Sequence, residues 1–451
     1  MTRNNPAITK GVDWSLIWLY FLLATIGILA IFATTYNEER DVNVVSSFLS
    51  FKTDYSKQFY FLLIAGVLGI FILLTDSKFF PATANLWYAL GIVLLILVFP
   101  FHSEVKGTKS IIRFGGFQFQ PAEFCKVCVA LALAKYLSLP DLDFRKTRSH
   151  LIAAAITLIP AIMSIMQSET GLALVYFSFF IVMYREGLPA TILVVGFSLA
   201  GLVVSTLLID KDVLAVIISA IAALFIYLMR RQIKRDRALL IVVVVIWFIS
   251  VGIQRFGVPF LFQKVMQPYQ VERIFSTIGK DVPTEYLSEE ERRKLEIEQH
   301  QKSDDGVDYN VRQSKIAIGS GGFAGKGILK ATQTRYDFVP EQRTDFIFCT
   351  IGEGFGFVGT FIVLAIYLIL LFRIVTVAER QRSVFSRCYA YGVASVFFFH
   401  IAINICMTIG LAPVIGIPLP FISYGGTSLI TFTVLLFILI RLDADRQMVL
   451  R

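Results

Sequence analysis

Long apolar stretches recur along almost the whole chain, and they restrict its possible folds more than any other feature. A helix needs about 20 mostly apolar residues to cross a bilayer, and stretches of that kind alternate with short polar loops. Hydrophobic residues make up 56% of the 451, more than soluble domains usually contain. We therefore expect an all-α, polytopic transmembrane helix bundle. Its twelve predicted spans are approximately 14–34, 58–75, 86–101, 119–138, 150–166, 170–184, 189–209, 213–229, 238–253, 345–373, 388–411 and 425–441.

Lys and Arg in the short loops predict which side of the membrane each loop occupies. They gather at 145–148, 230–237 and 380–387, whereas the opposite loop at 167–169 has none. Because basic residues favour the cytoplasmic side and an even number of spans returns the chain to its starting side, we expect both termini in the cytoplasm. The large loop from about 254 to about 344 then lies outside. This distribution accounts for the net charge of +9, and we expect no nucleic-acid partner.

A few polar residues lie in or beside the apolar stretches, where each costs a few kcal/mol unless it is paired or faces water. Glu123 and Lys126 are about one helical turn apart and share a face. They form either a buried ion pair that fixes helix packing or the charged wall of a hydrophilic cavity. Glu169, between two spans, is either a solvated hairpin tip or part of a site. His400 and Asn404 are spaced for an interhelical hydrogen-bonding pair, which we favour over a role as ligands.

The segment 410–426 contains three prolines and four glycines at membrane depth or near the outer interface. A continuous helix cannot pass through it. Irregular backbone is tolerated there only where it is buried in protein or lines a wet cavity. We therefore expect a re-entrant or broken segment beside a site.

The predicted outer loop has two parts of different composition. Residues 282–308 are crowded with charge, which indicates a solvated surface excursion. Residues 309–345 are rich in Gly, Gln, Ser and Thr. Backbone amides exposed by the glycines, together with Lys315, Lys326 and Arg335, suit an anionic ligand such as a diphosphate. The same composition is also typical of a mobile loop. The chain has no P-loop, so nucleotide-driven work is not expected.

Five ordered motifs together resemble the shape, elongation, division and sporulation (SEDS) family of bacterial membrane glycosyltransferases. The stretch at 332–334 is more similar to the cell-elongation branch than to the division branch of that family. The motifs are Phe119-Gln-Pro-Ala-Glu-Phe-Cys-Lys126, Pro268-Tyr-Gln-Val-Glu-Arg-Ile274, Tyr309-Asn-Val-Arg-Gln-Ser-Lys-Ile-Ala-Ile-Gly-Ser-Gly-Gly322, Phe338-Val-Pro-Glu-Gln-Arg-Thr-Asp-Phe-Ile-Phe348 and Gly416-Ile-Pro-Leu-Pro-Phe-Ile-Ser-Tyr-Gly-Gly-Thr-Ser428.

The resemblance implies a location, a reaction and partners. The location is the bacterial cytoplasmic (inner) membrane, and the reaction is polymerisation of lipid II into glycan strands on its outer face. The partners are a class B penicillin-binding transpeptidase and other membrane proteins of the elongation complex. A carboxylate acting as general base fits the loss of a proton from the attacking sugar hydroxyl. Cationic groups or a divalent cation, Mg or Mn, would offset charge on the departing diphosphate.

The resemblance also implies which residues react and bind. Family members carry an Asp, thought to be catalytic, just before the stretch that begins at Gln313 here. Anchoring the register on Gly306 and Tyr309 puts the strict position on Ser303. We therefore choose Asp304, one residue away, then Asp305, with Asp281 and Asp308 as alternatives. The motifs assign no metal ligands. The residues expected to bind substrate are Glu123, Lys126, Arg273, Gln313, Ser314, Lys315, Lys326, Glu341, Ser423, Gly425 and Gly426.

The chain departs from the family pattern in three respects. The context of the catalytic Asp differs, and a charged insertion at 282–302 precedes it. Ser110 and Ile111 stand where the family usually has Arg-Trp. The spans at 213–229 and 238–253 are an extra hairpin on a ten-span family core, and we treat 1–451 as one integral membrane domain.

Two other functions remain open at this point. One is a transporter (flippase) of the lipid-linked precursor, whose path Glu123, Lys126 and Glu169 would line. The other is a scaffold that positions a transpeptidase. We favour the glycosyltransferase, because the unusual polar stretch lies in an outer loop and not along several spans.

Overall fold

The computed structural model describes residues 11–36, 44–105, 108–114, 117–144, 146–265, 271, 275, 307–327 and 329–446. These residues contain nine helices that are long and apolar enough to cross a membrane, so the chain is a multi-pass membrane protein. Packing divides the chain into two compact units. One consists of residues 1–188 and 312–451, and the other of residues 189–311.

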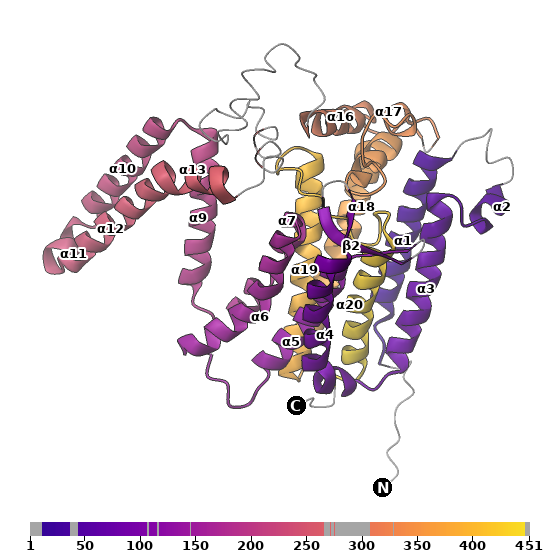
Figure 1. The fold of residues 1–451 in the computed structure, drawn as a ribbon, viewed down its shortest axis with the longest axis horizontal. Coiled ribbons are helices and arrows are strands. Elements are labelled where there is room, and N and C mark those ends of the chain that lie inside the picture. Colours follow the sequence, from indigo (N-terminus) through magenta and orange to yellow (C-terminus); the bar gives the residue numbers. More distant parts are fainter. Residues whose placement is uncertain are drawn as a thin grey trace, which may run out of the picture. The chain divides into compact units, whose positions relative to one another are not determined.

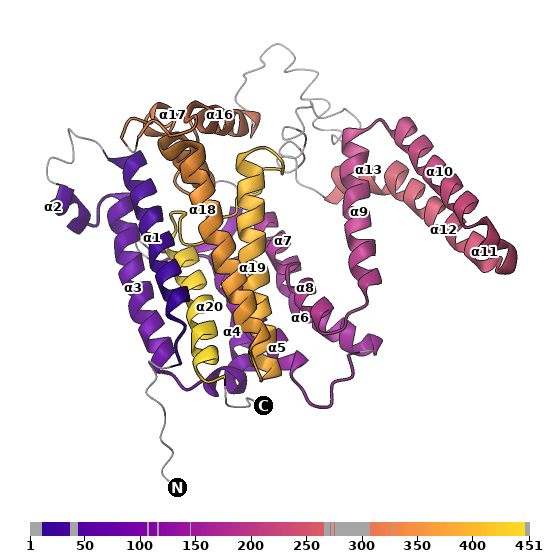
Figure 2. The ribbon, with the colours of Figure 1, turned by 180° about the vertical axis from the view of Figure 1, so that it is seen from behind.

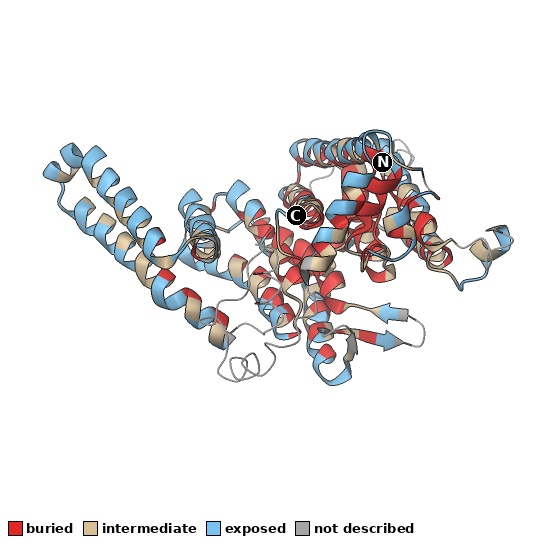
Figure 3. Cartoon of the chain, turned by 90° about the horizontal axis from the view of Figure 1, so that it is seen from above, coloured by how far each residue is buried: buried red, intermediate tan, exposed pale blue. Residues whose placement is uncertain are grey.

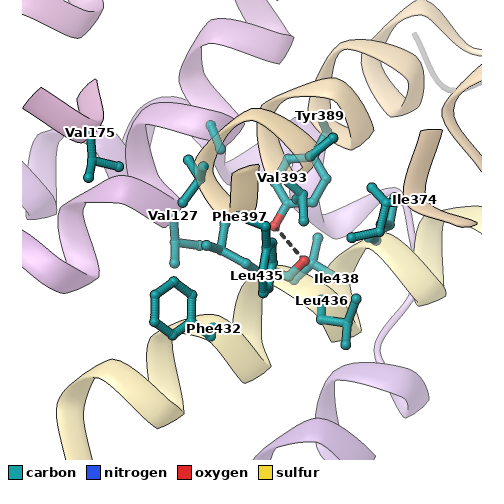
Figure 4. Packing of buried hydrophobic residues seen from close by; sticks show 14 of the residues in the cluster. Val127, Val175, Ile374, Tyr389, Val393, Phe397, Phe432, Leu435, Leu436 and Ile438 are labelled. Atoms are coloured by element: carbon teal, nitrogen blue, oxygen red, sulfur yellow. Dashed lines mark hydrogen bonds between the residues drawn. The ribbon is translucent and has the colours of Figure 1, made fainter. Parts of the chain in front are cut away.

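The first unit is a bundle of helices around an apolar core (Figures 1 and 2). Its helices are α1 (Trp14–Thr35), α2 (Val44–Leu49), α3 (Asp54–Leu74), α4 (Phe79–Phe101), α5 (Pro121–Leu137), α6 (Thr147–Met166), α7 (Thr170–Tyr176), α8 (Phe179–Arg185), α16 (Val307–Ser320, from Arg312 onward), α17 (Thr332–Arg335), α18 (Ile347–Glu379), α19 (Val384–Thr408) and α20 (Gly426–Ala444). The α5 helix packs against α4 and α19, and α20 packs against α3. In the core the hydroxyl of Tyr389 donates to the carbonyl of Leu435, near Phe397 and Phe432 (Figure 4).

A small antiparallel sheet follows α4, which the expectation of an all-α chain did not include. The strands β1 (Ser103–Val105), β2 (Thr108–Phe114) and β3 (Phe117–Phe119) pair in that order. Two adjacent isoleucines in β2 favour extended backbone. The α5 helix begins directly after the sheet, with Pro121 at its first turn. The sheet thus fixes where α5 starts.

All twelve predicted spans are helical, but three of them are not among the nine candidate membrane helices. The span predicted at 119–138 becomes α5, which has only 17 residues. Almost all of α5 is buried among other helices, so its length need not match the lipid. The span predicted at 170–184 is divided into α7 and α8 near the buried Ser178. The third is the span predicted at 189–209.

The second unit is helical over most of residues 190–265. It contains α9 (Ala190–Leu208), α10 (Lys211–Leu228), α11 (Arg230–Arg235), α12 (Ala238–Gly252) and α13 (Val258–Phe260), with π-helical turns at Ile253–Gly257 and Leu261–Val265. The α10 and α12 helices pack against each other as a hairpin. Their apolar side chains are mostly exposed (Figure 3), as expected for helices that face lipid.

The helix that begins with α12 continues to Val265, so the loop predicted from Gln254 starts later than expected. Contacts with the start of α10 accommodate the polar residues in this extension. Gln254 donates to the carbonyl of Lys211 at 2.5 Å, and Arg255 pairs with Asp212 at 2.6 Å.

The start of α1 and the end of α20 lie at the same end of the first unit. Arg380, between α18 and α19, binds Asp13 at 2.7 Å and also pairs with Asp443. Arg373 adds a second contact to Asp13 at 2.8 Å. These ion pairs join three helices at the end where the described chain begins and finishes.

Candidate active site

Glu123 and Lys126 form an ion pair in the interior of the first unit. Nζ of Lys126 is 2.7 Å from Oε2 of Glu123 and 2.8 Å from Nε2 of His400 on α19. It also lies 5.0 Å from the ring centre of Phe432 on α20. The two charged side chains are at most 2% exposed. The geometry is that of a buried ion pair within α5, packed against α19 and α20, and a role toward substrate stays a prediction.

The segment between α19 and α20 is the broken segment expected from its prolines and glycines. It folds into the protein, where side chains of α19 satisfy its carbonyl groups. Nδ1 of His400 lies 3.1 Å from the carbonyl oxygen of Pro418, and Asn404 donates to the carbonyl of Ile417 at 2.7 Å. Asn404 also donates to the carbonyl of Asp345 at 2.8 Å. This is how irregular backbone is tolerated at membrane depth.

Ser423 joins this segment to the turn that precedes α18. Its hydroxyl donates to the carbonyl of Thr344 at 2.6 Å. Gln58 on α3 donates to the carbonyl of Ser423 and accepts from the amide of Gly425, both at 3.2 Å. Gly426 is the first residue of α20. Three predicted substrate-binding positions therefore meet where α3, α18 and α20 come together.

The glycine-rich stretch after α16 packs its backbone against the N-terminal part of α18. The amides of Lys326 and Gly327 donate to the carbonyls of Glu353 and Gly354 at 3.0 and 2.9 Å. Gly325 has a φ of 82°, and a Cβ there would lie 2.2 Å from the carbonyl oxygen of Gly354. Because these amides are already bonded, they are not the exposed diphosphate donors that the composition suggested. The glycines permit close packing instead.

Glu353 is a buried carboxylate that the sequence analysis missed. Its Oε1 accepts from Nζ of Lys326 at 2.8 Å and from the amides of Thr332 and Gln333 at 2.9 Å. Its Oε2 accepts from the amide and the hydroxyl of Thr334, both at 2.9 Å. The side chain is 0% exposed. A carboxylate flanked by glycines inside an apolar span was the available signal.

Glu169 contacts the small sheet and is more than a solvated hairpin tip. It accepts from the hydroxyl of Ser110 on β2 and from Nε2 of Gln120 at 3.0 Å. Ser110 is one of the positions at which this chain departs from the pattern that the resemblance predicts. The structure places that position directly against a carboxylate.

Known proteins resemble this chain over most of its length. The family model described as "cell cycle protein", which covers FtsW, RodA and SpoVE, matches residues 13–235 and 197–448. The chain belongs to this family.

Relatives within the family cover most of the chain. The peptidoglycan glycosyltransferase RodA of Treponema pallidum (strain Nichols) is 30% identical over 96% of this chain and 97% of its own. The peptidoglycan glycosyltransferase MrdB of Escherichia coli (strain K12) is 28% identical over 84% of each chain.

Solved structures share the fold. A chain from a peptidoglycan synthase complex matches with a TM-score of 0.64 and 22% identity, over 96% of this chain and 98% of that one. RodA of Thermus thermophilus matches with a TM-score of 0.56 and 21% identity, over 99% of both chains.

The catalytic Asp predicted from the FtsW, RodA and SpoVE pattern is not placed by the structure. Asp281, Asp304 and Asp305 lie outside the described residues, as do Arg273 and the charged insertion. Asp308 lies in α16, but its side chain is outside the description. These assignments stay predictions.

The other family positions in this region are described. On α16, Lys315 is exposed and Gln313 is half-buried, whereas the buried Ser314 donates to the carbonyl of Thr408 at 2.8 Å. Glu341 has a φ of 55° and accepts a hydroxyl hydrogen bond within its own turn at 3.0 Å.

Within the described residues, no group of three or more His, Cys, Asp and Glu side chains could hold a metal ion. A divalent cation such as Mg needs only one or two carboxylates when substrate phosphates complete its coordination. Whether the loop carboxylates bind such a cation stays a prediction.

Proposed function

We propose that this protein is a peptidoglycan glycosyltransferase that polymerises lipid II into glycan strands during cell elongation and shape maintenance. The observation that carries this proposal is the similarity to RodA of Treponema pallidum over nearly the whole chain. In the reaction, an acceptor sugar hydroxyl attacks the anomeric carbon of a donor sugar. A glycosidic bond forms as the bond to undecaprenyl diphosphate breaks.

The chain offers groups for both halves of this step. A loop carboxylate, Asp304 or a neighbour, takes the proton of the attacking hydroxyl. Lys315 is exposed, and Lys326 is 28% exposed and paired with Glu353. Both ammonium groups would offset the charge that grows on the departing diphosphate.

We place both termini in the cytoplasm and the reaction on the outer face of the membrane. The basic loops support this orientation. Arg380 brings the two ends of the described chain to one end of the first unit, and α16 and α17 lie at its other end (Figure 1). The predicted site and the termini would thus face opposite sides.

A class B penicillin-binding transpeptidase and other elongation-complex membrane proteins are the proposed partners. The solved synthase complex with the same fold coordinates polymerization and crosslinking. A polymerase of this kind needs such a partner to link the strands that it makes.

Polymerisation in detergent separates this function from the two alternatives. A micelle has no two sides, so a flippase would do nothing measurable there, and a scaffold would make no bond. Purified protein with its partner transpeptidase should convert lipid II into glycan, and the transpeptidase alone should not. If glycan is absent under conditions where the protein stays folded, the proposal is wrong.

A further inference from the structure

A polar hollow lies beside α2. The α2 helix lies toward the same end of the first unit as α16 and α17 (Figures 1 and 2). Its volume is about 590 Å³, within the range of about 300–1,000 Å³ that is common for small-molecule sites. We propose that it binds N-acetylated amino sugars, which rests on the proposed function. Most of the lining carries hydroxyl groups, namely Thr35, Ser46, Ser47, Ser50 and Thr53.

The wall of the hollow combines charged groups with hydroxyls. Arg343 is paired with Asp54 at 2.8 Å and with Asp337 at 3.2 Å. Lys52 also lines the hollow. These charged groups together with the hydroxyls present hydrogen-bond donors and acceptors side by side. Sugar hydroxyls and N-acetyl groups require that mixture.

The wall that contains α2 is held in place by α3. The hydroxyl of Ser56 donates to the carbonyl of Phe48 at 2.6 Å and accepts from the amide of Phe51 at 3.0 Å. Tyr60 donates to the carbonyl of Leu49 at 3.0 Å. These bonds keep Phe51 at a φ of 55°, which is rare outside glycine. The hollow is therefore built before any ligand arrives.

One lining group lacks a partner. The hydroxyl oxygen of Thr53 is buried, and within the described part of the chain it makes no hydrogen bond. Buried polar groups normally have a partner. Rotation about the Cα–Cβ bond of Thr53 would turn this hydroxyl toward the hollow. A bound sugar would then supply the missing hydrogen-bond partner.

Arg343, in the wall of the hollow, belongs to the motif at 338–348 and contacts the segment before α20. The carbonyl of Arg343 accepts from the amide of Tyr424 at 2.8 Å, next to the position of Ser423. A sugar bound against Arg343 would therefore lie beside the predicted substrate-binding segment. The sugar could belong to the head group of the lipid-linked substrate or to the growing strand.

The test fills the hollow and compares two ligands. Ser46→Trp places a large side chain in the lining, and Val45→Trp, at the adjacent exposed position of α2, is the matched control. The full chain in detergent is titrated with chitotetraose, a lipid-free amino-sugar oligomer, by saturation-transfer NMR. The apparent KM for lipid II is measured in parallel.

Ser46→Trp, but not Val45→Trp, should weaken chitotetraose binding, raise the apparent KM for lipid II, or do both. The expected change is about tenfold, equivalent to about 1.4 kcal/mol. An effect on chitotetraose indicates the strand, and an effect on lipid II alone indicates the lipid-linked head group. If the two variants do not differ in either measurement, the inference is wrong. It is also wrong if free pentapeptide, but not chitotetraose, shows the Ser46-dependent signal. If the wild type makes no polymer, the proposed function fails, and chitotetraose binding still decides the sugar site.

Discussion

Nζ of Lys326 lies 2.8 Å from Oε1 of Glu353, a fully buried carboxylate in the N-terminal part of α18. The same carboxylate accepts from three consecutive backbone amides, from Thr332 to Thr334. It thereby fixes both a predicted substrate-binding lysine and the turn that follows it. We regard Glu353 as a positioning residue for the candidate site.

Removing this carboxylate should destabilise the protein. In Glu353→Ala three amides and the Thr334 hydroxyl lose their acceptor, and an unsatisfied buried group costs about 1–3 kcal/mol. Glu353→Gln keeps one acceptor oxygen and should have a smaller effect. Thermal unfolding midpoints in detergent should decrease from the wild type to Glu353→Gln to Glu353→Ala. Glu379→Ala, which changes an exposed glutamate, is the control. Equal midpoints for Glu353→Ala and Glu379→Ala would refute the positioning role.

The buried pair of Glu123 and Lys126 should show strong coupling. Lys126→Met leaves an uncompensated buried carboxylate, which costs roughly 3–5 kcal/mol, whereas replacing both partners by neutral groups is often nearly harmless. The double variant Glu123→Gln with Lys126→Met should therefore be more stable than Lys126→Met alone. Folded yield and unfolding midpoints test this. A double variant that is folded but inactive would additionally support a role toward substrate.

Acid should weaken the ion pairs of Asp13. Burial raises the pKa of this carboxyl, but hydrogen bonds from Ser15, Arg373 and Arg380 outweigh it and lower the pKa below its usual value. Because its pKa is lowered in the folded state, ionised Asp13 contributes fully to the free energy of unfolding above the unfolded pKa of about 3.9. This contribution is lost as the pH falls through the pKa of the folded state.

Asp13→Asn should thus lower stability at pH 7 by roughly 1–3 kcal/mol and reduce the loss of stability below about pH 4. Unfolding midpoints across pH measure both effects. The exposed Asp141→Asn serves as control. If the unfolding midpoint of Asp13→Asn falls below pH 4 as steeply as that of the wild type, ionised Asp13 does not stabilise the protein as proposed.

Gly27 should tolerate no side chain, because α1 crosses the broken segment there. A Cβ at Gly27 would lie 2.7 Å from the Cα and the carbonyl oxygen of Ile422, and backbone atoms cannot move aside cheaply. Gly66 on α3 has open space around it. Gly27→Ala should lower stability and polymerisation, whereas Gly66→Ala should be neutral or stabilising by up to about 1 kcal/mol. Similar midpoints for both variants would show that the contact is not tight.

The sequence predicted the membrane helices well, because length and hydropathy report directly on the lipid environment. It missed the small sheet and placed the start of the loop too early. Local composition does not reveal that β2 pairs with two short neighbours or that Arg255 finds Asp212. It also predicted the broken segment before α20 from its prolines and glycines.

The candidate site was predicted less completely. Motif positions such as Ser423 and Lys326 could be chosen from the sequence, but their partners could not. Glu353 looked like one more residue of an apolar span, and its role depends on a turn about twenty residues earlier. Contacts between distant segments, not local pattern, decide such roles.

The most direct test is the glycan that purified protein makes from lipid II in detergent with its partner transpeptidase. The wild type should form polymer. A variant with Asn at Asp281, Asp304, Asp305 and Asp308 should form none while keeping its unfolding midpoint, and restoring Asp304 alone should bring polymer back. Failure of the folded wild type to form polymer, or wild-type rates from the quadruple variant, would contradict the proposed carboxylate-assisted glycosyl transfer.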